Sequence, residues 1–247
     1  MCDCQKICLI IPCYNEEQRL DIEEFRRYCS DELIFVFVND GSTDNTHQLL
    51  IAQTGRNWHV VNLDENRGKS EAIRQGVLFV QNSGLVQDIQ WFGFWDSDLS
   101  VPLYELENFF RYSACFSTDA EAIIGSRVRR MGSEIIRSAV RHYLGRLFCT
   151  LVSFLFSMTY YDTQCGAKIF KRELLETGFV QPFSSNWIFD VELLLRLRTR
   201  TIIEYPLHVW QEKPGSRIRF STVPFEVLKD LISLKKNNGR WGKKGKD

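Results

Sequence analysis

Two aspartates one residue apart, Asp96 and Asp98, follow an aromatic, uncharged run in the sequence FWDSDLS at positions 94–100. In an extended segment, residues i and i+2 point to the same side, so both carboxylates can approach one divalent cation. Mg²⁺ prefers one or two carboxylates together with phosphate oxygens and water. The alternative is a capped turn before a helix, because two aspartates at this spacing are a weak signal by themselves. The pair predicts a cation site, and the surrounding elements must indicate which ligand the cation would bind.

A third carboxylate, Asp40, ends an apolar run at the start of the stretch NDGSTDNT. It can accept hydrogen bonds from a base N–H or a ribose hydroxyl, although an Asx turn before a helix is the alternative. Arg67 and Lys69 flank Gly68 at another predicted helix start, where they form either an anion site or solvated surface charge. The sequence contains no GxxxxGK[ST], GxGxxG or GxSxG motif, which argues against a P-loop, a nicotinamide or flavin cofactor and an α/β-hydrolase.

The elements that must position these residues alternate between apolar runs and amphipathic stretches. This alternation predicts a mostly parallel sheet with helices on both faces, in which ligands bind beyond the carboxyl ends of the strands. The polar clusters at 14–16, 39–40 and 96–98 all fall at such ends, and after about residue 126 the chain is expected to become more helical. The expected strands are 6–12, 33–40, 58–63, 89–96 and 121–127, and the expected helices are 14–29, 41–54, 66–81 and 101–113.

The composition is that of an ordinary globular protein. The chain has 247 residues, of which 44% are hydrophobic, and its formal net charge is zero, which argues against a nucleic-acid partner. Eight cysteines without a CxxC pair favour reduced thiols in the cytosol. No signal peptide is expected, and the longest uncharged run, 147–161, is shorter than the ~20 residues that cross a bilayer.

Several motifs together resemble a known family. LIIPCYNEE, VNDGSTDNT, NRGKSEAI, WDSDLS and IIGSR occur in the order of the family-2 glycosyltransferases of GT-A fold. Later, DTQCGAKIFKRELL, FDVELLLRL and WQEKPGSR resemble the polyprenyl-phosphate sugar transferases, which include the dolichyl-phosphate glucosyltransferases and mannose synthases. The resemblance covers about residues 7–235. It implies one Rossmann-like GT-A domain over 1–234, with a nucleotide-sugar half at 1–126, an acceptor half at 127–234 and a basic tail at 235–247.

The resemblance also implies a set of site residues. A nucleotide diphosphate sugar is expected in a pocket near the carboxyl ends of the first strands, with Mg²⁺ or Mn²⁺ held mainly by Asp98. The residues expected to bind the donor are Pro12, Tyr14, Glu16, Val38, Asp40, Lys69, Asp96, Ser97 and Asp98, and the expected metal ligands are Asp96, Asp98 and Ser100.

Three further residues are expected to take part in the transfer. In the family, the arginines at the positions of Arg127 and Arg217 face the diphosphate or the acceptor phosphate. Asp190 lies where relatives with hydroxyl acceptors keep a general base, although capping of the following helix is the alternative. Mannose-type relatives have an arginine where this chain has Gln211, which favours UDP-glucose over GDP-mannose. Attack in line with the leaving group would invert the anomeric carbon.

A lipid acceptor requires contact with a membrane. Residues 127–148 are rich in arginine, and Ile136, Val140, Leu144 and Leu147 recur at helical spacing before the uncharged run. This pattern predicts an interfacial helix pair on the cytoplasmic face of an anionic membrane, with a core helix as the alternative. Two other functions remain open at this point. One is a transferase that acts on a saccharide hydroxyl, and the other is a nucleotide-sugar-binding protein without turnover.

Overall fold

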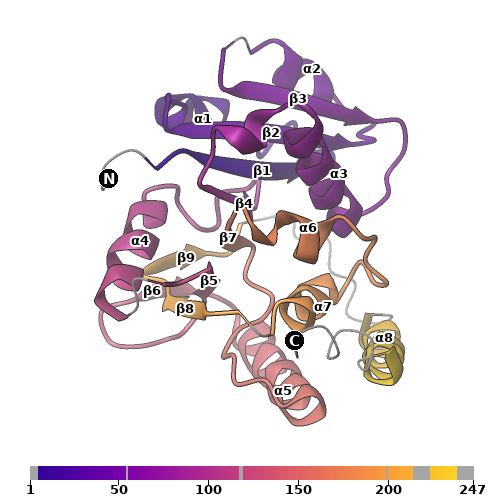
Figure 1. Ribbon diagram of the computed structural model, residues 1–247. Coiled ribbons are helices and arrows are strands. Elements are labelled where there is room, and N and C mark those ends of the chain that lie inside the picture. Colours follow the sequence, from indigo (N-terminus) through magenta and orange to yellow (C-terminus); the bar gives the residue numbers. More distant parts are fainter. Residues whose placement is uncertain (1–4, 54, 117–118, 199, 214–222, 238–247) are drawn as a thin grey trace, which may run out of the picture.

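A seven-stranded sheet runs through the computed structural model, which describes residues 5–53, 55–116, 119–198, 200–213 and 223–237 (Figure 1). The strand order is β3-β2-β1-β4-β7-β5-β8. All pairs are parallel except those that β7 makes with β4 and β5. The bounds are β1 (Ile7–Cys13), β2 (Leu33–Asp40), β3 (Trp58–Leu63), β4 (Trp91–Trp95), β5 (Ala122–Ser126), β7 (Ala167–Lys171) and β8 (Ile202–Pro206).

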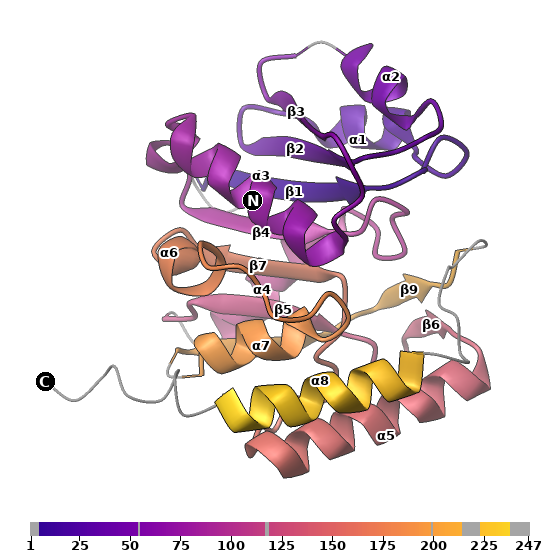
Figure 2. The same cartoon turned by 90° about the vertical axis from the view of Figure 1, so that its right-hand side faces the viewer.

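Helices cover both faces of this sheet, and a second sheet of two short strands lies beside it (Figures 1 and 2). The short strands, β6 (Glu134–Ile136) and β9 (Val209–Gln211), pair in parallel. The helices are α1 (Ile22–Tyr28), α2 (Thr46–Ile51), α3 (Lys69–Asn82), α4 (Glu105–Phe116), α5 (Ala139–Phe156), α6 (Leu174–Phe179), α7 (Phe189–Arg196) and α8 (Val223–Asn237), with a 3-10 turn at Leu85–Gln87.

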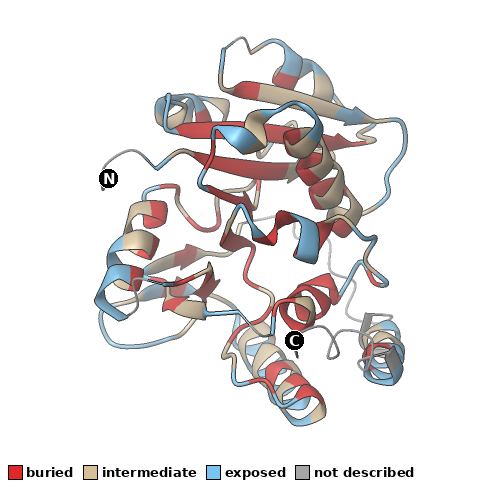
Figure 3. Cartoon of the chain, viewed as in Figure 1, coloured by how far each residue is buried: buried red, intermediate tan, exposed pale blue. Residues whose placement is uncertain are grey.

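The alternation of side chains along the strands divides the core into two layers. In β1, Ile7, Leu9 and Ile11 pack on the face covered by α1 and α4, whereas Cys8 and Ile10 pack beneath α3, α6 and α7. Both sides of β1 and β2 are therefore buried, as expected of central strands in a parallel sheet, and Figure 3 shows them mostly in red. This burial fixes the register that brings the strand ends together.

The five strands predicted from the first half of the sequence are confirmed as β1 to β5, and the α/β fold class is confirmed. The second half holds more strands than expected. Residues 167–171 form β7, which inserts antiparallel between β4 and β5. Its buried lysine, Lys168, interrupts the apolar pattern that marks the other strands, so the strand was not anticipated.

The segment expected to form an interfacial helix pair has a different structure. Residues 134–136 form β6, because Ile135 pairs with Trp210 of β9, and a single helix, α5, follows. The expected apolar face is largely exposed rather than buried in a core, as Val140 and Leu147 show. Figure 2 shows α5 and α8 side by side, and Leu231 and Leu234 of α8 belong to the same buried cluster as Val152 of α5.

Gly93 allows β4 and β7 to approach closely. A Cβ atom at this position would lie 2.2 Å from the carbonyl oxygen of Lys168 and 2.9 Å from the Cα of Ile169. Replacing Gly93 with alanine should therefore lower the free energy of unfolding by about 1–3 kcal/mol, which urea denaturation can measure. Gly55→Ala is the control, since its nearest atom would be 3.7 Å away. Equal stability of the two variants would contradict the close approach.

Candidate active site

The carboxyl ends of β1, β2 and β4 surround a cavity of about 560 Å³. Eight of the residues predicted to bind the donor line this donor cavity: Pro12, Tyr14, Glu16, Asp40, Lys69, Asp96, Ser97 and Asp98. Val38 and Ser100 are buried and are not part of the lining. Arg127 and Asp190 also lie elsewhere, and Arg217 is outside the described residues.

Hydrogen bonds between two sequence motifs fix the loops at the base of the donor cavity. The Asn15 N–H donates to the Ser42 hydroxyl at 2.9 Å, and the Asn15 side-chain oxygen accepts from the Thr43 N–H at 2.7 Å. The Glu16 N–H donates to the hydroxyl of Thr46 at 2.7 Å. The loop after β1 is therefore tied to the loop after β2, which explains why polar residues cluster in both motifs.

Asp40 connects β2 to the beginning of α3. Its two carboxylate oxygens accept hydrogen bonds from the N–H groups of Arg67 and Gly68, at 2.8 and 2.9 Å. Burial raises the pKa of Asp40 above its ordinary value, and the two backbone hydrogen bonds offset part of that rise. Each carboxylate oxygen can accept more than one hydrogen bond, so Asp40 can orient the loop and still accept one from a ligand.

Asp96 and Asp98 line the same wall but have different partners. Oδ1 of Asp96 accepts a hydrogen bond from Nζ of Lys69 at 2.5 Å. Oδ1 of Asp98 accepts one from the N–H of Ser100 at 2.9 Å, so the turn considered as an alternative is present. Burial alone would lower the pKa of Lys69, but Asp96, Asp190 and Asp98 together raise it above its usual value. Lys69 is therefore a cation among carboxylates.

The carboxylates of Asp96 and Asp98 fit a divalent ion whose other ligands come from a bound molecule and water. Among the described residues, no group of three histidine, cysteine, aspartate or glutamate side chains is arranged to hold a metal. Mg²⁺ keeps several waters and commonly uses one or two carboxylates with substrate phosphates, so Asp96 and Asp98 suffice when a diphosphate completes the shell. The absence of a side chain at Gly166 leaves space for the carboxylate of Asp96, because a Cβ atom at position 166 would lie 1.8 Å from Oδ2 of Asp96.

A second pocket, which we call the basic pocket, is much smaller than the donor cavity, with a volume of about 10 Å³. Its lining includes Arg127, Arg137, His142, Arg146 and Gln164. The guanidinium of Arg127 donates two hydrogen bonds to the carboxylate of Asp162, at 2.5 and 2.8 Å, and the Arg127 N–H donates a third at 3.2 Å. Burial by itself would raise the pKa of Asp162, but the Arg127 guanidinium holds it well below its usual range.

Arg137 supplies the least compensated charge in the basic pocket. Within the described part of the chain, its guanidinium donates no hydrogen bond and forms no ion pair. Burial and then the neighbouring Arg127 lower the pKa of Arg137, and nearby arginines also contribute to a lowered pKa of His142. A half-buried guanidinium beside other cations favours binding of an anion such as a phosphate group.

Asp190 occupies a buried ion pair beneath the donor cavity. Its Oδ1 accepts a hydrogen bond from Nζ of Lys168 at 2.6 Å, and Lys168, which is 0% exposed, also donates to the carbonyl oxygen of Cys165. The N-cap of α7 is Ile188, so Asp190 does not cap that helix. Asp190 is therefore paired with Lys168 and does not line the donor cavity.

Six wall residues of the donor cavity were not predicted from the sequence: Cys13, Arg19, Asn66, Gly68, Asn186 and Trp187. Asn186 and Trp187 reach it from the loop between α6 and α7. The only sequence signal for these two was a tryptophan within a polar stretch immediately before the FDVE motif.

Strand β9 reaches the metal-site turn from the other side. The N–H of Gln211 donates to the carbonyl oxygen of Ser100 at 3.0 Å. The next residue, Glu212, accepts a hydrogen bond from the N–H of Ser138, the N-cap of α5, and binds Arg141 in the first turn of that helix. The turn that contains Asp98 and the beginning of α5 are therefore joined through β9.

Comparison with known proteins identifies the class to which this fold and site belong. Residues 8–179 match the model of glycosyl transferase family 2, and the chain belongs to this family. Glucosyl-3-phosphoglycerate synthase from Mycobacterium tuberculosis, in complex with Mn²⁺, UDP-glucose and phosphoglyceric acid, is similar in fold, with a TM-score of 0.68. That similarity covers 94% of this chain and 80% of the other at 19% identity.

Similar sequences are found among the dolichyl-phosphate β-glucosyltransferases. The protein from Saccharomyces cerevisiae is 31% identical over 245 residues, which span 92% of this chain and 73% of that protein. The protein from Homo sapiens is 29% identical over 260 residues, with 96% and 78% covered. The resemblance inferred from the motifs is confirmed at the level of the family.

Removing the charge of Asp162 should destabilise the fold. Asp162→Asn leaves Arg127 without its buried counter-ion, so the free energy of unfolding should fall by about 3 kcal/mol at pH 7, measured by urea denaturation. The folded pKa of Asp162 is depressed, so its contribution is complete above the ordinary value of 3.8 and is lost as the pH falls below it. The difference between wild type and variant should therefore shrink at acidic pH.

The matched control is Asp88→Asn, because Asp88 is exposed. A stability difference between Asp162→Asn and wild type that did not change between pH 7 and pH 3 would contradict this role for the ion pair.

Proposed function

We propose that this protein is a metal-dependent, inverting hexosyltransferase that moves glucose from UDP-glucose to a polyprenyl phosphate at the cytoplasmic face of a membrane. The observation that carries this proposal is that one loop, 162–166, contributes to the wall of the basic pocket and lies against the wall of the donor cavity. Gly166 lies against Asp96 of the donor cavity, and Asp162 binds Arg127 of the basic pocket. A reaction that replaces one phosphate by another at a sugar carbon requires two such pockets side by side.

The choice of donor rests on the relatives and on one residue. The similar curated proteins from yeast and human are named dolichyl-phosphate β-glucosyltransferases, and the similar solved structure contains UDP-glucose. Gln211 stands where mannose-type relatives have an arginine, so GDP-mannose is the second candidate donor. Tyr14, Glu16 and Asp40 would bind the nucleoside part at the ends of β1 and β2.

The proposed mechanism assigns each charge a role. Asp98 and Asp96 would hold Mg²⁺ or Mn²⁺, which would supply positive charge to stabilise the departing nucleoside diphosphate. Lys69 adds a cation to the same wall. A polyprenyl phosphate is already an anion near neutral pH, so Arg137 and its neighbours need to position it rather than deprotonate it. Attack opposite to the leaving group inverts the anomeric carbon.

Asp190 fits a phosphate acceptor better than a hydroxyl acceptor. A general base for a hydroxyl must lie within hydrogen-bond reach of the proton that it removes. Asp190 is buried, binds Lys168 at 2.6 Å and does not line the donor cavity. This geometry weighs against a saccharide acceptor.

A transfer assay with two labelled donors tests the proposal. The protein is incubated with Mn²⁺, vesicles that contain polyprenyl phosphate, and labelled UDP-glucose or GDP-mannose. We expect label to enter the organic-extractable fraction with UDP-glucose. Label in water-soluble glycan would identify a saccharide acceptor instead, and nucleotide binding without transfer would identify a binding protein.

Asp98→Asn separates the charge of Asp98 from its structural role. The asparagine oxygen can still accept the hydrogen bond from Ser100, so the melting temperature should stay within a few degrees of wild type. Loss of the metal ligand should reduce transfer at least about 100-fold. Asp88→Asn, at an exposed position, is the control, and wild-type rates in Asp98→Asn would contradict the assignment of the metal site.

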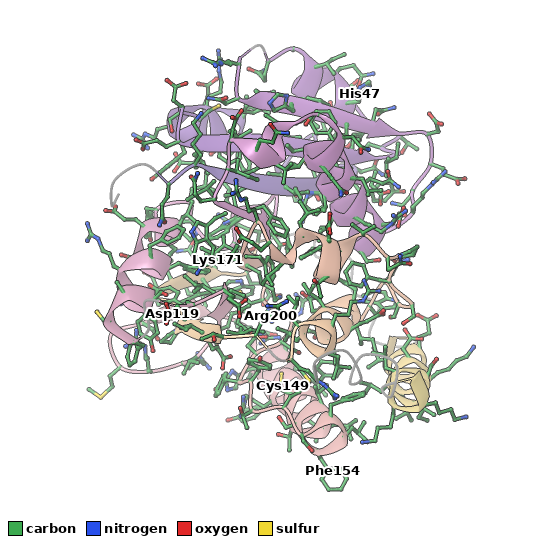
Figure 4. All side chains as sticks on the ribbon, in the orientation of Figure 1. His47, Asp119, Cys149, Phe154, Lys171 and Arg200 are labelled. Carbon is green, nitrogen blue, oxygen red and sulfur yellow. The ribbon has the colours of Figure 1, made fainter. Side chains whose placement is uncertain are left out.

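An exposed apolar surface on α5 supports the membrane part of the proposal. Nothing among the described helices is both long and apolar enough to cross a bilayer. Tyr143, Leu147 and Phe154 are nonetheless exposed, with Phe154 at 84%, and Figure 4 shows Phe154 extending away from α5. Residues of the same helix, including His142 and Arg146, line the basic pocket. Apolar side chains beside basic ones are typical of a helix that lies on an anionic bilayer.

Phe154→Ser should weaken binding to anionic vesicles. Transfer of this side chain into lipid is worth about 1.5–3 kcal/mol, so the partition coefficient in a flotation assay should fall roughly tenfold or more. The matched control is Phe116→Ser, because Phe116 is 68% exposed on α4. Equal losses in the two variants, or no loss in either, would contradict contact between α5 and the bilayer.

A further inference from the structure

Trp187 is an aromatic side chain on the wall of the donor cavity to which no role has been given. It belongs to the loop between α6 and α7 and is 39% exposed, although most other tryptophans of the chain are buried. The same wall carries Lys69, Asp96 and Asp98. An exposed indole among charged groups offers a flat apolar surface to a bound molecule, as in many ligand pockets.

Two neighbouring elements hold the backbone of this loop. The side chain of Asn186 donates to the carbonyl oxygen of Arg67 at 3.2 Å and accepts a hydrogen bond from the hydroxyl of Ser70, at the beginning of α3. The carbonyl oxygen of Trp187 accepts a hydrogen bond from Nε2 of Gln164 at 3.1 Å. Trp187 is therefore positioned by α3 on one side and by the loop before β7 on the other.

These contacts connect Trp187 to both the donor cavity and the basic pocket. Gln164, its hydrogen-bond partner, lines the basic pocket, whereas Trp187 itself lines the donor cavity. In the proposed transfer, the hexose is bonded first to the leaving diphosphate and then to the attacking phosphate. The sugar must therefore lie between the carboxylates of the donor cavity and the basic pocket, and Trp187 lines the first and bonds through its backbone to a residue of the second.

We propose that Trp187 is the platform for the transferred hexose, with the C–H face of the sugar packed against the indole. This inference rests on the proposed function and assigns the sugar-binding part of its donor cavity. The indole contributes apolar contact area, and the neighbouring Lys69 and carboxylates are available to the hydroxyl groups. A side chain in this place selects for a nucleotide that carries a sugar over the same nucleotide without one.

The test compares the affinities of two nucleotides in the presence of Mn²⁺. Calorimetry gives the Kd of UDP and of UDP-glucose for wild type, Trp187→Ala and Trp187→Phe. We expect Trp187→Ala to weaken UDP-glucose binding about tenfold and to leave UDP binding within twofold. Trp187→Phe should restore most of the loss. Tyr104→Ala is the control, because Tyr104 is 46% exposed and does not line the cavity.

Each other outcome overturns the inference. Equal weakening of UDP and UDP-glucose would mean that the indole binds the nucleotide rather than the sugar. Unchanged affinity for both would mean that Trp187 does not touch the donor. Because the readout is binding, it does not depend on the acceptor. Failure of wild type to glucosylate polyprenyl phosphate would count against the proposed function alone.

Discussion

Repulsion between neighbouring carboxylates is the constraint on which this structure depends. Asp96, Asp98 and Asp190 all lie near enough to Lys69 to raise its pKa. Lys69 binds Asp96, and the buried Lys168 binds Asp190, so the negative charges are interleaved with positive ones. This alternation allows two carboxylates to remain on one cavity wall without a bound cation. It also leaves the wall suited to a ligand that brings its own divalent ion.

The antiparallel strand β7 extends this arrangement toward the second pocket. Because β7 lies between β4 and β5, the loop before it passes the ends of both. At one end of that loop Asp162 neutralises Arg127, and at the other Gly166 yields space to Asp96. If this strand were parallel to its neighbours, it would begin at the other ends of β4 and β5, far from the donor cavity. The direction of one strand therefore determines that the donor cavity and the basic pocket share the loop 162–166.

The sequence predicted the first half of the chain well, because its strands are continuous apolar runs that end in polar residues. The same reasoning located Asp40, Asp96 and Asp98 correctly at the strand ends. It did not anticipate β7, whose buried Lys168 forms an ion pair with Asp190, 22 positions later in the chain. Nor did it place Trp187 on the cavity wall. Such features depend on partners distant in the sequence, and a local pattern does not reveal which side chains will meet.

The hydrogen bonds of β9 have a mechanical consequence. Gln211 of this short strand donates a hydrogen bond to the turn that follows Asp98. The next residue, Glu212, accepts a hydrogen bond from the N-cap of α5 and forms an ion pair with its first turn. The helix proposed to contact the bilayer and the turn proposed to bind the cation are thus linked by hydrogen bonds and an ion pair. If α5 lies on a membrane as proposed, a change in its tilt would be transmitted to the turn that contains Asp98, so membrane contact would affect the geometry of the proposed metal site.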